Sequence, residues 1–245
     1  MNTMKAFLGR GALAGAAGGI AAALFQWIVT EDQIRVALEI EAANSTDQAE
    51  EMFTRTTQVI GGMLAAGLYG LFLGVIFGFA CAVLWRALPG GTAFARSIRL
   101  ATVAFVAWAL VPQLKYPANP PAVGDPDTVG QRTASYLGLM AASLILAYMA
   151  WSAWKMLSER GYDGAKRFSI VAGGYLAGIA LFYVIFPANP DPVDVPANLM
   201  WHFRIDSLAG NALLWIVMGT VFGFLADYVG REDRVPVQVD ESVPV

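Results

Sequence analysis

The sequence predicts an all-α fold: a polytopic membrane helix bundle of six transmembrane helices arranged as three helical hairpins. Of its 245 residues, 57% are hydrophobic and only 14% are charged, whereas about 25% of the residues in a soluble domain are charged. Six apolar runs reach or approach the roughly 20 residues that a helix needs to cross a bilayer. The ten-residue alternating pattern typical of membrane β-barrels does not occur. These observations favour a helical membrane protein.

The expected spans follow one another along the chain. They cover residues 11–29, 59–85, 100–114, 134–154, 168–186 and 208–229. The third run has only 15 residues between Arg99 and Lys115 and contains Pro112. Because proline weakens a helix interior, five complete spans are the alternative.

The spans are expected to form one integral membrane domain over residues 1–229. Its three hairpins cover residues 8–85, 98–157 and 166–229. The first connection is polar, and both Thr30-x-x-Gln33 and Ser45-x-x-Gln48 resemble capping boxes. We therefore expect an outer helical insertion of two short helices over residues 30–57. The polar, proline-containing residues 230–245 are expected to form a disordered cytoplasmic tail.

The distribution of charge predicts that both termini are cytoplasmic. With that orientation, 11 of the 16 Lys and Arg residues lie inside, as the positive-inside rule requires. The same orientation puts 12 of the 19 acidic residues outside. The outer face then carries −7 (5 minus 12) and the inner face +4 (11 minus 7). A negative outer face would concentrate cations, although acidic residues are also simply tolerated on that side.

Glycines recur at helical spacing in several of the expected spans. The sets are Gly11/Gly15/Gly19, Gly70/Gly74/Gly78, Gly174/Gly178 and Gly219/Gly223. Small residues four positions apart let membrane helices approach closely. We expect them to pack helices within the bundle, with self-association as the alternative.

A five-residue phrase occurs twice and indicates a duplicated unit. Tyr116-Pro-Ala-Asn-Pro120 recurs as Phe186-Pro-Ala-Asn-Pro190, each time after a long apolar run. Arg132 and Arg204 then precede the next apolar runs, and Arg55 holds the same place in the first hairpin. A cation is unfavourable at a helix N-terminus, so each Arg should have an acidic partner. The candidates are Asp125 or Asp127 for Arg132, and Asp191 or Asp194 for Arg204.

The sequence does not predict an enzyme. It has none of the phosphate-binding loop, serine-hydrolase, zinc-protease or Cys-x-x-Cys patterns. It contains one histidine and one cysteine, and Asp227 is the only acid inside the expected spans. We expect no nucleic-acid partner, and the lipid bilayer is the partner that the apolar spans require.

Polar chemistry is concentrated in the two Pro-Ala-Asn-Pro loops and the start of the last span. Carboxylate and imidazole groups there could bind a divalent metal cation; these residues are Asp125, Asp127, Asp191, Asp194, His202 and Asp206. A second set would structure the loops or take part in binding: Asn119, Asn189, Pro117, Pro187, Arg132 and Arg204. The competing interpretation is that the acids only pair with the two arginines.

The block at residues 115–126, the second Pro-Ala-Asn-Pro loop and His202-Phe-Arg204 resemble the CbtA family of cobalt transporter subunits. The resemblance extends over nearly the whole chain. It implies a bacterial cytoplasmic (inner) membrane protein, often described with five spans, that works with CbtB, a small single-span subunit bearing histidines. Such a partner would explain why this chain has few metal ligands.

Two functional hypotheses follow. In the first, the chain is a subunit of an uptake transporter for cobalt or another transition-metal cation. Co²⁺ would be the transported ion, no cofactor would be permanently bound, and ions would pass between glycine-rich helices. In the second, the chain is a non-transporting membrane scaffold that assembles a partner complex.

Overall fold

The structure is a computed structural model that describes residues 4–44, 53–121, 123–189, 191 and 195–232. Within these residues it is helical, without strands. Six helical segments of the described chain are long and apolar enough to cross a membrane, which confirms the predicted fold class. They are Met4–Ala43, Arg55–Leu84, Ala93–Lys115, Pro126–Glu159, Gly164–Ile185 and Ala197–Tyr228. The predicted tail at 230–245 lies almost wholly outside the described residues.

The first helical segment is longer than the predicted span. Helix α1 (Met4–Phe25) continues through the π-helical turn η1 (Gln26–Thr30) into α2 (Glu31–Asn44). The interpretation of Thr30 as the start of a separate helix is therefore wrong, because the chain is already helical when it reaches Thr30. The second predicted capping box begins at Ser45 and lies outside the described residues. Helix α3 (Arg55–Leu84) is capped by Thr54, whose side chain accepts a hydrogen bond from the Thr57 amide.

The third segment is continuous despite its proline. It consists of α4 (Ala93–Phe105), the π-helical turn η2 (Val106–Leu110) and α5 (Val111–Lys115). Pro112 comes just after the π-helical turn η2, and such turns occur where the regular hydrogen-bond pattern of a helix is interrupted. At 23 residues, the segment is long enough to cross a bilayer, so the five-span alternative is not needed.

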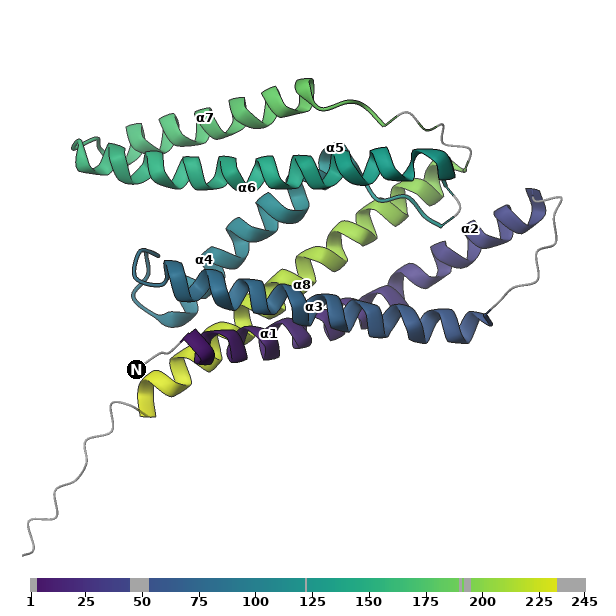
Figure 1. The fold of residues 1–245 in the computed structure, drawn as a ribbon, viewed down its shortest axis with the longest axis horizontal. Helices are drawn as coiled ribbons and strands as arrows, with labels where there is room; N and C mark the ends of the chain where they lie inside the picture. Colours follow the sequence, from purple (N-terminus) through teal and green to yellow (C-terminus); the bar gives the residue numbers. More distant parts are fainter. Residues whose placement is uncertain (1–3, 45–52, 122, 190, 192–194, 233–245) are drawn as a thin grey trace, which may run out of the picture.

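The remaining elements complete the bundle. A short 3₁₀ helix, η3 (Pro126–Thr128), precedes α6 (Val129–Glu159), and α7 (Gly164–Ile185) and α8 (Ala197–Glu232) follow. Successive spans alternate in direction, as predicted (Figure 1). Packing does not follow the chain order throughout, however. Helix α3 packs on α1, whereas α8 packs on α1 and α4, and α7 packs on α6 (Figure 1). Helices α7 and α8, which form the predicted third hairpin, are thus consecutive in the chain but do not pack mainly on each other.

Backbone contact joins α1 to α3. A Cβ atom added to any of six glycines would lie less than 3.0 Å from a backbone atom of the facing helix; they are Gly11, Gly15, Gly19, Gly70, Gly74 and Gly78. In lipid such close approach replaces the hydrophobic driving force that is available in water. The contact leaves no space for an ion between α1 and α3, so the route expected between glycine-rich helices does not run there.

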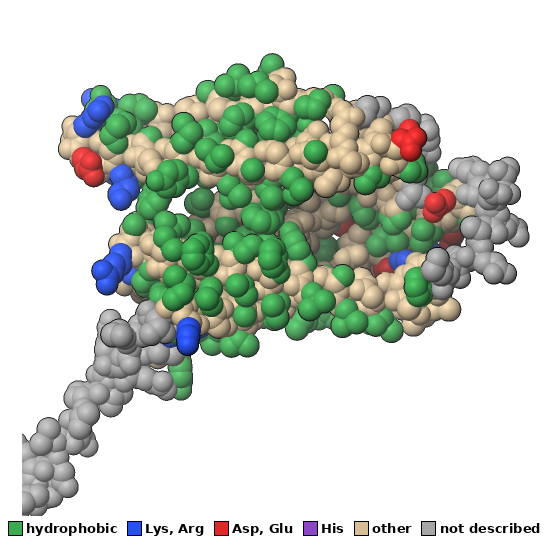
Figure 2. All heavy atoms as spheres, viewed as in Figure 1, with side chains coloured by type: hydrophobic (Ala, Val, Ile, Leu, Met, Phe, Trp, Pro, Cys, Tyr) green, Lys and Arg blue, Asp and Glu red, His purple; other side chains and the backbone are tan. Residues whose placement is uncertain are grey.

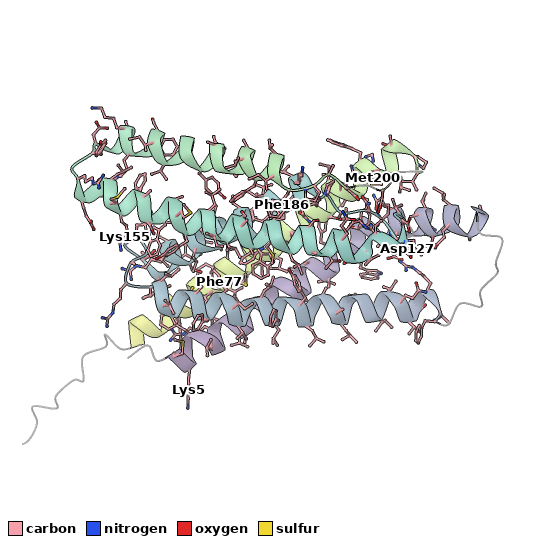
Figure 3. The ribbon with its side chains drawn as sticks, turned by 45° about the horizontal axis from the view of Figure 1, so that its top comes forward. Lys5, Phe77, Asp127, Lys155, Phe186 and Met200 are labelled. Atoms are coloured by element: carbon pink, nitrogen blue, oxygen red, sulfur yellow. The ribbon has the colours of Figure 1, made fainter. Side chains whose placement is uncertain are left out.

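An aromatic cluster fills the core beside this contact. The rings of Phe77 and Phe222 are 5.4 Å apart, and those of Phe7 and Trp85 are 5.3 Å apart, both edge to face. Phe7, Phe77 and Phe222 are buried, and Figure 3 labels Phe77 within the bundle. The cluster takes residues from α1, α3 and α8, so these three helices share one core.

Polar contacts hold α4 on α8. The carboxylate of Asp227 accepts hydrogen bonds from the amides of Ala93 and Phe94, at 3.0 and 3.3 Å. An acidic group stabilises a helix N-terminus, whose first amides otherwise have no partner. Deeper in the contact, the buried Ser97 hydroxyl donates to the Gly219 carbonyl at 2.7 Å. The one acid predicted inside a span therefore joins two helices.

Charge separates the two ends of the bundle. Lysine and arginine side chains gather at one end, here called the basic end, and most acidic side chains at the other, the acidic end (Figure 2). Lys5 and Lys155 lie at the basic end, whereas Asp127 and Met200 lie at the acidic end (Figure 3). The start of α1 and the end of α8 are both at the basic end (Figure 1).

Gly74→Ala should lower the stability of the protein by about 2 kcal/mol, because its methyl group would overlap the α1 backbone. Thermal unfolding in detergent would measure the change. Gly67→Ala is the matched control on the same helix, since nothing lies within 4 Å of its added methyl group, and alanine favours a helix. Equal melting temperatures for the two variants would contradict the close contact.

Candidate functional site

The two Pro-Ala-Asn-Pro loops meet at the acidic end. The Tyr116 hydroxyl of the first loop donates to the Pro187 carbonyl of the second at 2.6 Å. Where the helices lead into these loops, the Lys115 ammonium group donates to the Tyr183 carbonyl at 2.8 Å. The Tyr183 hydroxyl donates to the Val111 carbonyl at 2.7 Å. These bonds join α5 to α7, which otherwise packs mainly on α6. The repeated phrase therefore builds a contact between two hairpins.

Asp191 of the second loop is buried against the second hairpin. Its side chain is only 1% exposed, and Oδ2 lies 3.0 Å from the Nε atom of Arg132. The geometry of that pair is not that of a well-directed hydrogen bond, so the attraction is mainly that of an ion pair. The other oxygen, Oδ1, accepts from the Thr128 hydroxyl at 2.8 Å. Asp191 thus fixes the second loop to the beginning of α6.

Gly124 makes room for this ion pair. Its φ angle is +110°, a value that side chains disfavour, and a Cβ atom there would lie 2.7 Å from the Asp191 carboxylate. The Asp191 amide donates to the Asn189 side-chain oxygen at 3.3 Å. Both loops are therefore shaped around the buried carboxylate.

Arg204, near the start of the third hairpin's last helix, contacts the first loop, just as Arg132 contacts the second. Its Nη2 atom donates to the side-chain oxygen of Asn119, in the first loop, at 3.1 Å. The sequence predicted Asp125 or Asp127 as the partner of Arg132, which is wrong, because Arg132 pairs with Asp191. For Arg204 it predicted Asp191 or Asp194; Asp191 is the partner of Arg132, and Asp194 lies outside the described residues. Each arginine thus reaches the other loop, and the partner of Arg204 among the described residues is an amide. One reason why Arg132 does not pair with Asp125 is that the Asp125 carboxylate caps η3, where it accepts a hydrogen bond from the Asp127 amide at 2.9 Å.

The predicted metal-binding residues do not converge in the described part of the chain. Asp125 and Asp127 are exposed, Asp206 is half-buried, and Asp194 lies outside the described residues. His202 is exposed, with its Nδ1 atom 2.8 Å from the Asn198 carbonyl of the same helix. Among the described residues, no three His, Cys, Asp or Glu side chains are placed to hold a metal ion. The loop acids whose contacts are described serve the loop structure.

The first hairpin has its own version of the arginine contact. The Nη2 atom of Arg55, at the start of α3, lies 2.7 Å from the Glu31 carboxylate of α2, and its Nη1 atom donates to Gln58. This pair stays within one hairpin, whereas Arg132 and Arg204 connect two. The first hairpin thus has an arginine at the equivalent position, but that arginine does not connect two hairpins.

A cavity of about 490 Å³ lies beside the linked loops. Its wall comes from α5, the first turns of α6 and both loops. The polar part of the wall includes Gln113, Tyr116 and Tyr136, none of which is among the predicted site residues. Gln113 could have been recognised as an uncharged polar residue within an apolar run, since such residues are uncommon in membrane spans. The wall of the cavity therefore combines hydrogen-bonding and apolar side chains.

Comparison with known proteins identifies one family. The family model described as "Probable cobalt transporter subunit (CbtA)" matches residues 4–227. Searches of curated proteins and of solved structures gave no match.

Asp191→Asn should destabilise the protein by about 3 kcal/mol, because it leaves the Arg132 charge without its buried partner. Chemical or thermal unfolding in detergent would measure this. Asp32→Asn is the control, since Asp32 pairs with Arg35 on the surface, with side chains 83% and 65% exposed, and such pairs contribute at most about 1 kcal/mol. A small effect at Asp191 would show that the linked loops do not depend on the ion pair.

Proposed function

The chain belongs to the CbtA family of probable cobalt transporter subunits, and from this premise we propose that it is the membrane subunit of a cobalt uptake system. In this proposal it acts with a small, histidine-bearing single-span partner in the bacterial cytoplasmic membrane. Both chain termini face the cytoplasm, and the acidic end faces outward. The transported ion is Co²⁺.

The observation that carries the proposal is how few metal ligands this chain has. It contains one histidine and one cysteine; Cys81 is buried in the core, and His202 is exposed. Co²⁺ favours imidazole among protein ligands more than Mg²⁺ or Ca²⁺ does. A partner that brings histidines would therefore complete a site that this chain does not form among its described residues.

The charge distribution supports the direction of transport. With the basic end inside, the orientation follows the positive-inside rule. The acidic residues then face outward, where they raise the local concentration of cations. The linked loops and their cavity lie at the same end, so ions collected there would meet the cavity first.

A non-transporting scaffold is the second candidate. The observation that favours it is the close packing of α1 and α3, which leaves no ion path between them. Helix α7 also exposes large apolar side chains along its length, among them Leu176, Leu181 and Val184, and lipid or a partner helix could cover them. As a scaffold, the chain would hold the single-span subunit without itself conducting ions.

Co²⁺ uptake into sealed proteoliposomes is expected only when this chain and the single-span partner are reconstituted together. Each protein alone, at matched density, is the control. Uptake by the partner alone, at the rate of the pair, would assign transport to the partner and leave this chain as the scaffold. Uptake by this chain alone would remove the need for partner ligands.

Cysteine labelling would test the orientation. In a Cys81→Ala background, Asp127→Cys and Ala188→Cys, both exposed at the acidic end, should react with an impermeant maleimide in intact cells. Ser158→Cys, exposed near the basic end, is the matched control and should react only after permeabilisation. The reverse pattern would place the acidic end in the cytoplasm.

A further inference from the structure

The cavity at the acidic end offers hydrogen-bonding groups without a free charge. The polar residues that matter for its chemistry are Gln113, Tyr116, Asn119, Ser135, Tyr136 and Asn189. Proline, alanine, valine and leucine side chains form much of the remaining wall. The charged group in the wall is Arg132, and Asp191 pairs with it at 3.0 Å. The cavity is therefore close to neutral and lined with amides and hydroxyls.

One of these groups is a hydrogen-bond acceptor without a partner. The Oε1 atom of Gln113 is buried and has no hydrogen-bond partner within the described structure. A buried carbonyl without a donor costs free energy. A ligand that donates a hydrogen bond at this point would remove that cost, so the cavity is suited to a ligand that carries donors.

Resting on the function proposed above, we propose that this cavity binds the divalent cation with its inner shell of water still in place. Waters bound to a metal ion are strong donors, and the amide and hydroxyl oxygens of the wall can accept from them. Among the described residues, the wall contains no histidine, cysteine or carboxylate, the side chains that most readily displace water from a transition metal. Six waters occupy ~180 Å³, which fits within about 490 Å³.

A small anion is the competing ligand, because a guanidinium group forms part of the wall. Arg132, however, already has its counter-ion in the buried Asp191, and its Nη2 atom donates to the Asp125 carbonyl. An anion would have to compete with a carboxylate that is held in place by Thr128. The unpartnered group, Gln113, offers an acceptor, which also favours a donor-bearing cation over an anion.

Contact through water has a consequence for selectivity. Hydrated divalent cations resemble one another in size and charge, so a site that contacts only their water shell distinguishes them poorly. Mg²⁺ should therefore compete with Co²⁺ at the cavity. Selection of cobalt would then take place after dehydration, at ligands of the kind that the partner is proposed to supply.

Hexaamminecobalt(III) tests this inference, because its ammonia ligands donate hydrogen bonds and do not exchange. The full chain in nanodiscs should bind the complex, as measured by isothermal titration calorimetry, and Mg²⁺ should compete. Gln113→Leu removes the acceptor and should weaken binding about tenfold. Gln113→Glu keeps an acceptor, adds a negative charge and should strengthen binding. Gln33→Leu is the matched control: its Oε1 atom is also buried without a partner, but Gln33 does not line the cavity.

The outcomes separate this inference from the function on which it rests. If the complex does not bind, or binds equally to the Gln113 and Gln33 variants, the hydrated-ion site is overturned. Binding of inorganic phosphate in place of the complex would overturn it as well. Co²⁺ uptake with the partner, measured on the same preparation, decides the proposed function independently. Gln113→Glu changes the side-chain volume little, so it decides the inference even if Gln113→Leu fails to fold.

Discussion

The close contact between α1 and α3 is the constraint on which the rest of the structure depends. Inside a bilayer, burying apolar side chains between helices gains little over leaving them in lipid. Helix association must therefore come from dense packing and from polar contacts. The facing glycines let the two backbones touch, and the shared aromatic core then brings in α8. Asp227 and Ser97 in turn attach α4 to α8.

The α6–α7 pair is held in a different way. Helix α7 has no buried residue, and its attachment away from α6 consists largely of hydrogen bonds at the acidic end. The ion pair of Asp191 with Arg132 and the bond from Arg204 to Asn119 join the two repeated loops in both directions. The bundle therefore combines a tightly packed group of helices with a pair that is fixed mainly at one end.

This division bears on transport. The glycine contact closes the space between α1 and α3, whereas the cavity lies between α5, α6 and the linked loops. Both loops shape the cavity, and none of the described residues that line it carries a carboxylate. A neutral wall of amides and hydroxyls suits the hydrated ion proposed above, whose dehydration would then take place at groups elsewhere.

Much of this architecture could be predicted from local sequence. Apolar runs of sufficient length determine the spans, and glycines at four-residue spacing determine which helix faces can approach closely, because both effects act within one helix. The partners of Arg132 and Arg204, the packing of α8 on α1 and the cavity beside Gln113 could not be predicted. They depend on which loop lies over which helix, and two copies of one motif are locally equivalent. Only the three-dimensional arrangement breaks that equivalence, because it brings Asp191 within ion-pair distance of Arg132 rather than of the arginine nearer in the chain.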